Sequence, residues 1–105
     1  MINVTVQPGV CGFATRITAD SEDMQNVQLN LETECPNIKP METELTEADG
    51  FAECFSKIGD STVYQMGKKY CRHAACPVPC AIIKGIEAAC ELALPRDVEI
   101  KIEKK

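Results

Sequence analysis

The sequence is poor in aromatic residues and in histidine. Its 105 residues include no Trp, three Phe, two Tyr and one His. A hydrophobic core must therefore be built from Ile, Val, Leu, Ala and Cys side chains. A single His without an acidic partner nearby in the sequence gives no support for a protease-like triad. Motifs of several other site classes are also absent: Cys-x-x-Cys, Gly-x-Gly-x-x-Gly, the Walker A loop and His-Glu-x-x-His.

No stretch of the sequence has the length of a transmembrane helix, and the alternating residues 1–7 do not resemble a signal peptide. Acidic side chains outnumber basic ones by 16 to 11, which gives a net charge of −5. An acidic surface argues against nucleic acid as a partner, because phosphate binding needs a basic face. We therefore expect a cytoplasmic protein that binds neither nucleic acid nor membranes. A protein partner, the oligomeric state and enzymatic activity stay open.

Length and composition indicate a single soluble domain over residues 1–105, with 45% hydrophobic and 26% charged residues. Apolar residues alternate with polar ones in residues 2–7, 13–20 and 26–33, which predicts three strands joined by short turns. Three such strands form an antiparallel meander with one buried face.

After the third strand, the apolar residues follow helical spacing instead of alternation. We predict a first short helix capped by Asn37 and a second short helix around residues 51–55. A third helix is expected to be capped by Ser61 or Thr62 and to run through Tyr70.

The C-terminal third of the sequence predicts one long helix and one strand. Pro79 suits the first position of the longest helix, residues 79–93, and residues 97–103 alternate again as in a strand. The predicted fold class is α+β: a two-layer fold in which an antiparallel β-meander carries helices on one face, in the order β-β-β-α-α-α-β.

The seven cysteines are the most informative residues of the sequence. Their odd number excludes a disulfide framework that pairs every Cys within the chain, and cytoplasmic thiols stay reduced. Several cysteines in such a domain indicate metal, cluster or thiol chemistry. Cys54 and Cys90 lie on apolar helix stripes and are assigned to the core. Cys80 lies near the start of the long helix and is compatible with either the core or the site.

The remaining four cysteines lie where the predicted backbone changes character. Cys11 follows the first strand, Cys35 follows the third, and Cys71 and Cys76 precede the long helix. In a β-meander, the turn after strand one and the exit of strand three lie at the same end of the sheet. A helix N-terminus at that end would bring Cys76 close and would favour its thiolate. We predict that these four thiolates are the ligands of a metal site, with zinc or an iron–sulfur cluster as the cofactor.

The order of these features resembles the NifU/IscU-like iron–sulfur scaffold family. In that family a Cys-Gly turn follows strand one, a second Cys follows strand three, and a third precedes the long C-terminal helix. Residues 10–12, 34–36 and 75–77 fill these places here. Phe13 stands where the family has an acidic residue, and Ala75 stands where it has a His. The resemblance implies cluster binding through Cys11, Cys35 and Cys76.

The sequence also resembles a small uncharacterised family of anaerobe-type proteins. The shared patterns are Val-Cys-Gly-Phe at residues 10–13, Glu-Cys-Pro-Asn-Ile at 34–38 and His-Ala-Ala-Cys-Pro-Val-Pro at 73–79. This resemblance spans nearly the whole chain and implies no particular activity.

Two further hypotheses compete with metal binding. The first is metal-free thiol chemistry, such as redox sensing or sulfur relay, which requires one especially reactive thiol at Cys76 or Cys71. Arg72 and His73 would add positive charge near such a thiol. The second is a plain protein-interaction domain in which the cysteines pack as small apolar residues.

Overall fold

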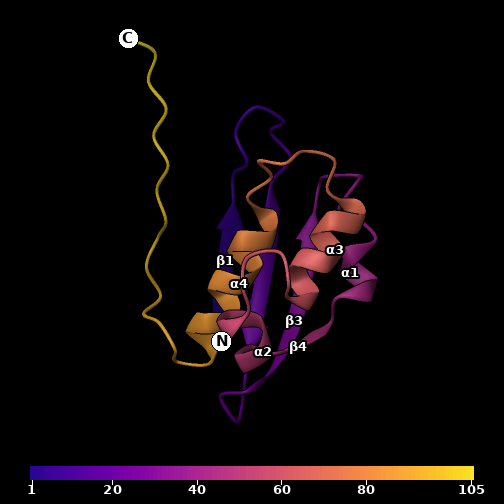
Figure 1. The fold of residues 1–105 in the computed structure, drawn as a ribbon, viewed down its shortest axis with the longest axis vertical. Helices are drawn as coiled ribbons and strands as arrows, with labels where there is room; N and C mark the ends of the chain where they lie inside the picture. Colours follow the sequence, from indigo (N-terminus) through magenta and orange to yellow (C-terminus); the bar gives the residue numbers. More distant parts are fainter.

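A computed structural model describes residues 1–105 as a four-stranded sheet with four helices (Figure 1). The fold is of the mixed α+β class, as predicted. The elements follow in the order β1 (Ile2–Val6), β2 (Thr15–Asp20), β3 (Asn26–Thr33), α1 (Met41–Glu44), β4 (Glu47–Asp49), α2 (Gly50–Phe55), α3 (Thr62–Tyr70) and α4 (Val78–Ala89).

The first three strands form the predicted antiparallel meander, and the sheet order is β1-β2-β3-β4. Val4 pairs with Ile17, and Ile17 pairs in turn with Leu31. Along β3, exposed and buried residues alternate without interruption, so one face of the sheet is buried and the other is polar. Because β1 and β3 are both antiparallel to β2, their C-terminal ends lie at the same end of the sheet.

The helices lie on one face of the sheet, as predicted, and α4 packs across β1 and β2 (Figure 1). Ile82 and Ile86 of α4 are fully buried in the core. Gly85 allows the close approach, because a Cβ atom at this position would lie 3.0 Å from Val4 Cγ2. None of the four helices is both long and apolar enough to cross a membrane.

Helix α3 confirms the sequence prediction closely. The Ser61 side chain accepts a hydrogen bond from the Tyr64 N–H at 3.3 Å, and the helix ends at Tyr70. Buried Glu53 of α2 adds a second cap, because its carboxylate accepts from the Val63 N–H at 3.1 Å. These bonds satisfy N–H groups that a helix start leaves without partners.

Two predicted helix boundaries are wrong. Asn37 caps no helix, because residues 36–40 form a turn in which the Ile38 and Lys39 N–H groups donate to the Cys35 carbonyl. Helix α1 therefore begins at Met41, after Pro40. The long helix spans residues 78–89 instead of 79–93, since Cys90 leaves the helix and the next residue has a positive φ.

The predicted strand at residues 97–103 is also wrong. This segment is exposed, has no sheet partner and runs away from the end of α4 as an extended tail. The fourth strand is β4 instead, which pairs with β3 through Val27 and Ala48. The element order consequently differs from β-β-β-α-α-α-β. Alternation identified an amphipathic segment at 97–103, but it carries no information on whether a sheet edge pairs with it.

Candidate thiol site

The connection between α3 and α4 places one cysteine at the C-terminal end of α3 and another before the N-terminal end of α4. Cys71 closes α3, and its N–H donates to the Gly67 carbonyl at 2.8 Å. After the exposed residues 72–75, the Cys76 N–H donates to the His73 carbonyl at 3.1 Å. Pro77 then caps α4. Two helix ends and one turn therefore fix the backbone on both sides of this thiol pair.

A third cysteine reaches the same region from the sheet. Cys35 follows β3, and its N–H donates to Thr33 Oγ1 at 3.1 Å. The Thr33 hydroxyl also lies 2.7 Å from the hydroxyl of Thr15, and both threonines are buried. The Cys35 carbonyl accepts the N–H groups of the following turn. Cys35 is thus held by a buried hydroxyl pair rather than by a flexible loop.

The thiols of Cys35, Cys71 and Cys76 form one cluster, which we call the thiol site. All three are half-buried and pack against the hydrophobic core. Burial raises the pKa of Cys71 to about 12, and three further causes act in the same direction: negative charge on Cys76, a side-chain hydrogen bond with Cys76, and negative charge on Cys35. Cys71 therefore stays protonated to a higher pH than an ordinary thiol.

The two helices make the Cys71–Cys76 pair electrostatically unequal. Cys71 lies at the C-terminal end of α3, where the helix dipole disfavours negative charge. Cys76 lies at the N-terminal end of α4, where the dipole favours it. The dipole of α3 therefore acts on Cys71 in the same sense as burial, which raises the pKa of this thiol.

Gly67 is a positioning residue that the sequence did not reveal. A Cβ atom at Gly67 would lie 2.9 Å from Pro79 Cγ and 4.0 Å from Cys71 Sγ. The absence of a side chain therefore lets α3 pack against the start of α4, and this contact sets the separation of Cys71 and Cys76. A glycine in the middle of a predicted helix was the available signal, because such a residue often marks a close packing contact.

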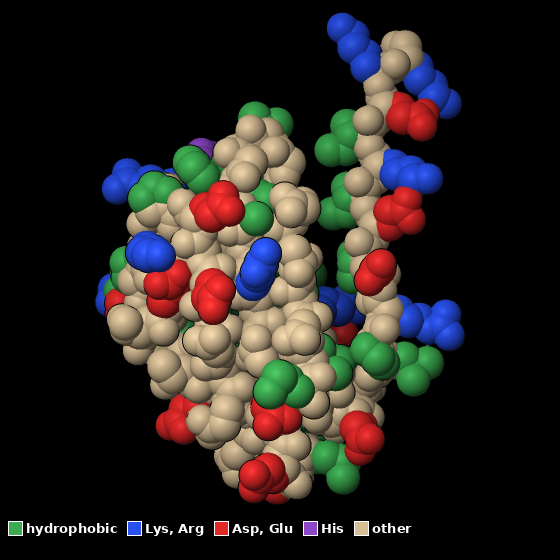
Figure 2. Space-filling view, turned by 180° about the vertical axis from the view of Figure 1, so that it is seen from behind, with side chains coloured by type: hydrophobic (Ala, Val, Ile, Leu, Met, Phe, Trp, Pro, Cys, Tyr) green, Lys and Arg blue, Asp and Glu red, His purple; other side chains and the backbone are tan.

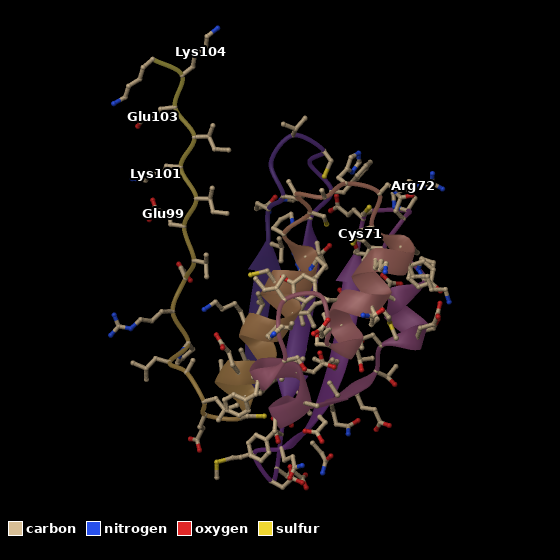
Figure 3. The ribbon with its side chains drawn as sticks, in the orientation of Figure 1. Cys71, Arg72, Glu99, Lys101, Glu103 and Lys104 are labelled. Carbon is tan, nitrogen blue, oxygen red and sulfur yellow. The ribbon has the colours of Figure 1, made fainter.

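Cys11 and Cys80 do not join the thiol site in this structure. Cys11 is exposed in the β1–β2 turn, which lies at the same end of the molecule as the α3–α4 connection (Figure 1). Cys80 is exposed on the first turn of α4, and negative charge there adds to burial in raising the pKa of Tyr64. The Arg72 side chain points outward beside Cys71 rather than toward the core (Figure 3). His73 is likewise exposed.

Cys54 and Cys90 form a second thiol pair, which lies outside the thiol site. Cys90 is buried and Cys54 is half-buried, in agreement with their assignment to the core. Burial raises the pKa of Cys54 to about 11, with further contributions from Glu87, Cys90 and Glu53. Helical spacing placed each residue on an apolar stripe, but it did not show that the two stripes meet.

The metal site predicted at Cys11, Cys35, Cys71 and Cys76 stays a prediction. No group of three or more His, Cys, Asp or Glu side chains is arranged to hold a metal ion. The donor type fits a soft metal, because the thiol site consists of thiols alone, but the present arrangement does not fit a ligand set.

Residues 2–102 match the model of a protein family of unknown function. The chain belongs to this family, DUF6951. The match confirms that the sequence belongs to an uncharacterised family, whereas the resemblance to NifU/IscU-like scaffolds and the anaerobe origin stay predictions. No curated protein and no solved structure matches the chain. Membership of DUF6951 carries no activity, so the function must be argued from the thiol site.

Proposed function

We propose that the protein exchanges thiols and disulfides through Cys71 and Cys76. The observation that carries this proposal is the inequality of the pair: Cys71 is half-buried at the end of α3 and has a raised pKa, and its neighbour Cys76 lies at the start of α4. Thiol–disulfide exchange needs one thiolate that attacks and one thiol that resolves the mixed disulfide. Cys76 takes the first role and Cys71 the second.

The proposed reaction oxidises the pair and reduces a disulfide of a partner. The Cys76 thiolate attacks one partner sulfur, the partner S–S bond breaks, and the leaving thiolate takes up a proton. Cys71 then loses its proton and attacks Cys76 Sγ, which breaks the mixed disulfide and releases the second partner thiol. Two thiols of this chain become one disulfide, and one partner disulfide becomes two thiols. The exposed residues 72–75 leave room for a partner beside the pair.

Replacement of the resolving thiol tests the assignment of roles. In Cys71→Ser, Cys76 still attacks a small disulfide such as oxidised glutathione, but the mixed disulfide persists, and its mass is seen on Cys76. In Cys76→Ser, the resolving thiol stays protonated, so no rapid adduct forms. Cys80→Ser is the matched control, because Cys80 is an exposed thiol on the same helix. Adduct formation at Cys11 and Cys80 as rapid as at Cys76 contradicts the proposal.

A second candidate function is binding of a metal or iron–sulfur cluster by Cys11, Cys35, Cys71 and Cys76. The specific observation in its favour is that Cys35 supplies a third thiol to the site. Mutual repulsion among thiolates is relieved by a cation, so metal binding would release the protons that the cluster retains. In this proposal a bound metal or cluster supplies positive charge to the thiolates.

Cys35→Ser separates the two candidate functions. Disulfide exchange uses Cys71 and Cys76 alone and is retained in this variant, whereas metal binding loses a ligand. Titration with Co²⁺ under anaerobic conditions provides the measurement, since thiolate ligation gives a charge-transfer absorption band. A band in the wild type that disappears in Cys35→Ser favours metal binding. Absence of the band, together with rapid exchange in both proteins, favours thiol–disulfide exchange.

A further inference from the structure

The C-terminal segment after α4 has the pattern of a strand but no partner. Val98, Ile100 and Ile102 are 60%, 76% and 92% exposed. Hydrophobic side chains of the extended segment face the domain, charged side chains lie on its outer side, and the segment stands apart from the domain (Figure 2). Glu99 and Lys101 point away from the domain and pair with each other at 3.2 Å (Figure 3). The apolar side of this segment is exposed to water in the single chain. Such a side is suited to pack against another apolar surface.

The two edges of the sheet differ in how well they are protected from further pairing. The β4 edge has three residues, two of which are Glu47 and Asp49. The β1 edge has five residues, Ile-Asn-Val-Thr-Val, with no charge and no proline. Short strands, charges and prolines are the usual means by which a sheet edge avoids pairing with another strand. The outer N–H and C=O groups of β1 are therefore open to an added strand.

The surface next to the β1 edge suits a strand with branched apolar side chains. Ile2 and Val4 are half-buried and point to the helix side of the sheet, toward α4. Gly85 packs on Val4, and Ala88 and Ala89 line a hollow together with Ile2. Because these helix residues are small, a strand beside β1 has space on this side for Val98, Ile100 and Ile102.

The opposite face offers matching charge. Arg16 of β2 pairs with Thr5 of β1, is exposed and forms no ion pair. Side chains alternate between the faces of a strand, so a segment that turns its apolar side chains toward α4 brings three acidic residues and one basic residue, Asp97, Glu99, Lys101 and Glu103, onto the face of Arg16. The charge pattern of the segment therefore complements the edge that it would cover.

We propose that two copies of this chain exchange their C-terminal segments, so that residues 97–103 of each copy form an antiparallel strand on β1 of the other. The segment runs in the same direction as β1 of its own chain (Figure 1). Its own edge is thus available only to parallel pairing, which is less stable and foreign to this antiparallel sheet. A copy related by a two-fold axis presents the segment in the opposite direction, and the exchange closes a symmetric dimer.

The oligomeric state of the full chain tests this proposal, independently of the thiol site. Light scattering coupled to gel filtration should give a dimer mass for the reduced wild type. Ile100→Asp should give a monomer that keeps the helical signal in circular dichroism, because the residue is exposed in the single chain and the domain folds without it. Lys101→Ser is the matched control on the charged side and should remain a dimer. A wild type that is a monomer at all concentrations overturns the proposal.

A second measurement identifies which copy supplies the strand. A photo-crosslinking residue at Asn3 of β1, in a mixture of isotopically heavy and light chains, should form crosslinks to residues 97–103 that join one heavy and one light chain. Crosslinks confined to a single chain show that the segment folds back on its own edge and overturn the exchange. A dimer whose crosslinks avoid residues 97–103 overturns it equally.

Discussion

At the scale of single residues, the fold gives different environments to two thiols, Cys71 and Cys76, that are only five positions apart in the sequence. Cys71 ends one helix and Cys76 precedes the next, so the two helix dipoles act on them with opposite sign. Burial adds to the difference at Cys71. The thiol site therefore contains one thiol, Cys71, whose pKa is raised, and a second thiol, Cys76, at the start of the next helix.

This inequality predicts an alkaline loss of stability. The pKa of Cys71 is raised from 9.0 to about 12 in the folded chain, so between these pH values the unfolded chain releases the proton first. The folded state is then relatively disfavoured, and the free energy of unfolding decreases as the pH rises from about 9 to about 12. Denaturant unfolding at several pH values should show a smaller decrease in Cys71→Ser. Cys11→Ser, which alters an exposed thiol, should follow the wild type.

The buried hydroxyl pair that holds Cys35 gives a second prediction. Thr33→Val removes the acceptor of the Cys35 N–H and leaves the Thr15 hydroxyl without its partner. Unsatisfied buried polar groups cost about 1–3 kcal/mol, and we expect a loss of this size in denaturant unfolding. Thr43→Val is a control on an exposed Thr. Equal stability of both variants would show that the hydroxyl pair does not hold the turn.

At the scale of secondary structure, the contact between α3 and α4 sets the geometry of the thiol pair. Gly67 and Pro79 are the residues at which the helices meet, and both are buried. Neither has a polar or reactive side chain, yet the position of Cys71 depends on them. The thiols of Cys71 and Cys76 therefore lie side by side only because α4 packs against α3.

Gly67→Ala should push the two helices apart. The added Cβ meets Pro79 Cγ at a distance that the ring cannot relieve by rotation, so we expect a loss of about 1–3 kcal/mol, as for other overpacked contacts. Exchange with oxidised glutathione should also leave more of the mixed disulfide unresolved, because Cys71 is displaced from Cys76. Lys68→Ala, an exposed change in the same helix, should affect neither stability nor exchange. Wild-type behaviour of Gly67→Ala would contradict the role given to this contact.

The sequence predicted the elements whose patterns depend on burial alone. The first three strands and α3 were found because alternation or a Ser cap marks them. Strand β4 was missed, since its three residues are mostly exposed and pair through their backbone. Residues 97–103 were assigned to a strand because alternation records two unlike faces and does not record a partner.

The thiol site was predicted in part for a similar reason. The order of cysteines along a meander placed Cys35 and Cys76 at one end of the sheet, and the structure brings them together with Cys71. Cys11 belongs to the same end but lies on an exposed turn, whose direction no periodic pattern describes. The contact between Cys54 and Cys90 depends on the packing of α2 against α4, which helical spacing does not contain.

At the scale of the whole molecule, a single layer of helices covers one face of the sheet. Ile82 and Ile86 of α4 pack with Ile17 and Leu31 of the sheet in one buried cluster. The thiol site lies at one end of this cluster, and its half-buried cysteines pack against it. The same core that stabilises the fold therefore keeps the Cys71 thiol partly away from water.

Ile82→Ala tests the dependence of the fold on α4. Ile82 is fully buried, and removal of a side chain of this size from a core costs about 2–5 kcal/mol. We expect a loss in this range in the free energy of unfolding, measured with urea. Leu94→Ala removes a similar side chain that is 71% exposed and should have little effect. Similar losses in both variants would show that α4 is not the main cover of the sheet.

The central claim, that Cys71 and Cys76 form a reversible redox pair, is tested most directly by mapping disulfides. The wild type and Cys35→Ser are equilibrated in glutathione buffers of increasing potential, the free thiols are blocked, and the linked peptides are identified by mass spectrometry. The account predicts that the first disulfide to appear joins Cys71 to Cys76, with the same midpoint in both proteins. A first disulfide between any other two cysteines, or none at any potential, would contradict it.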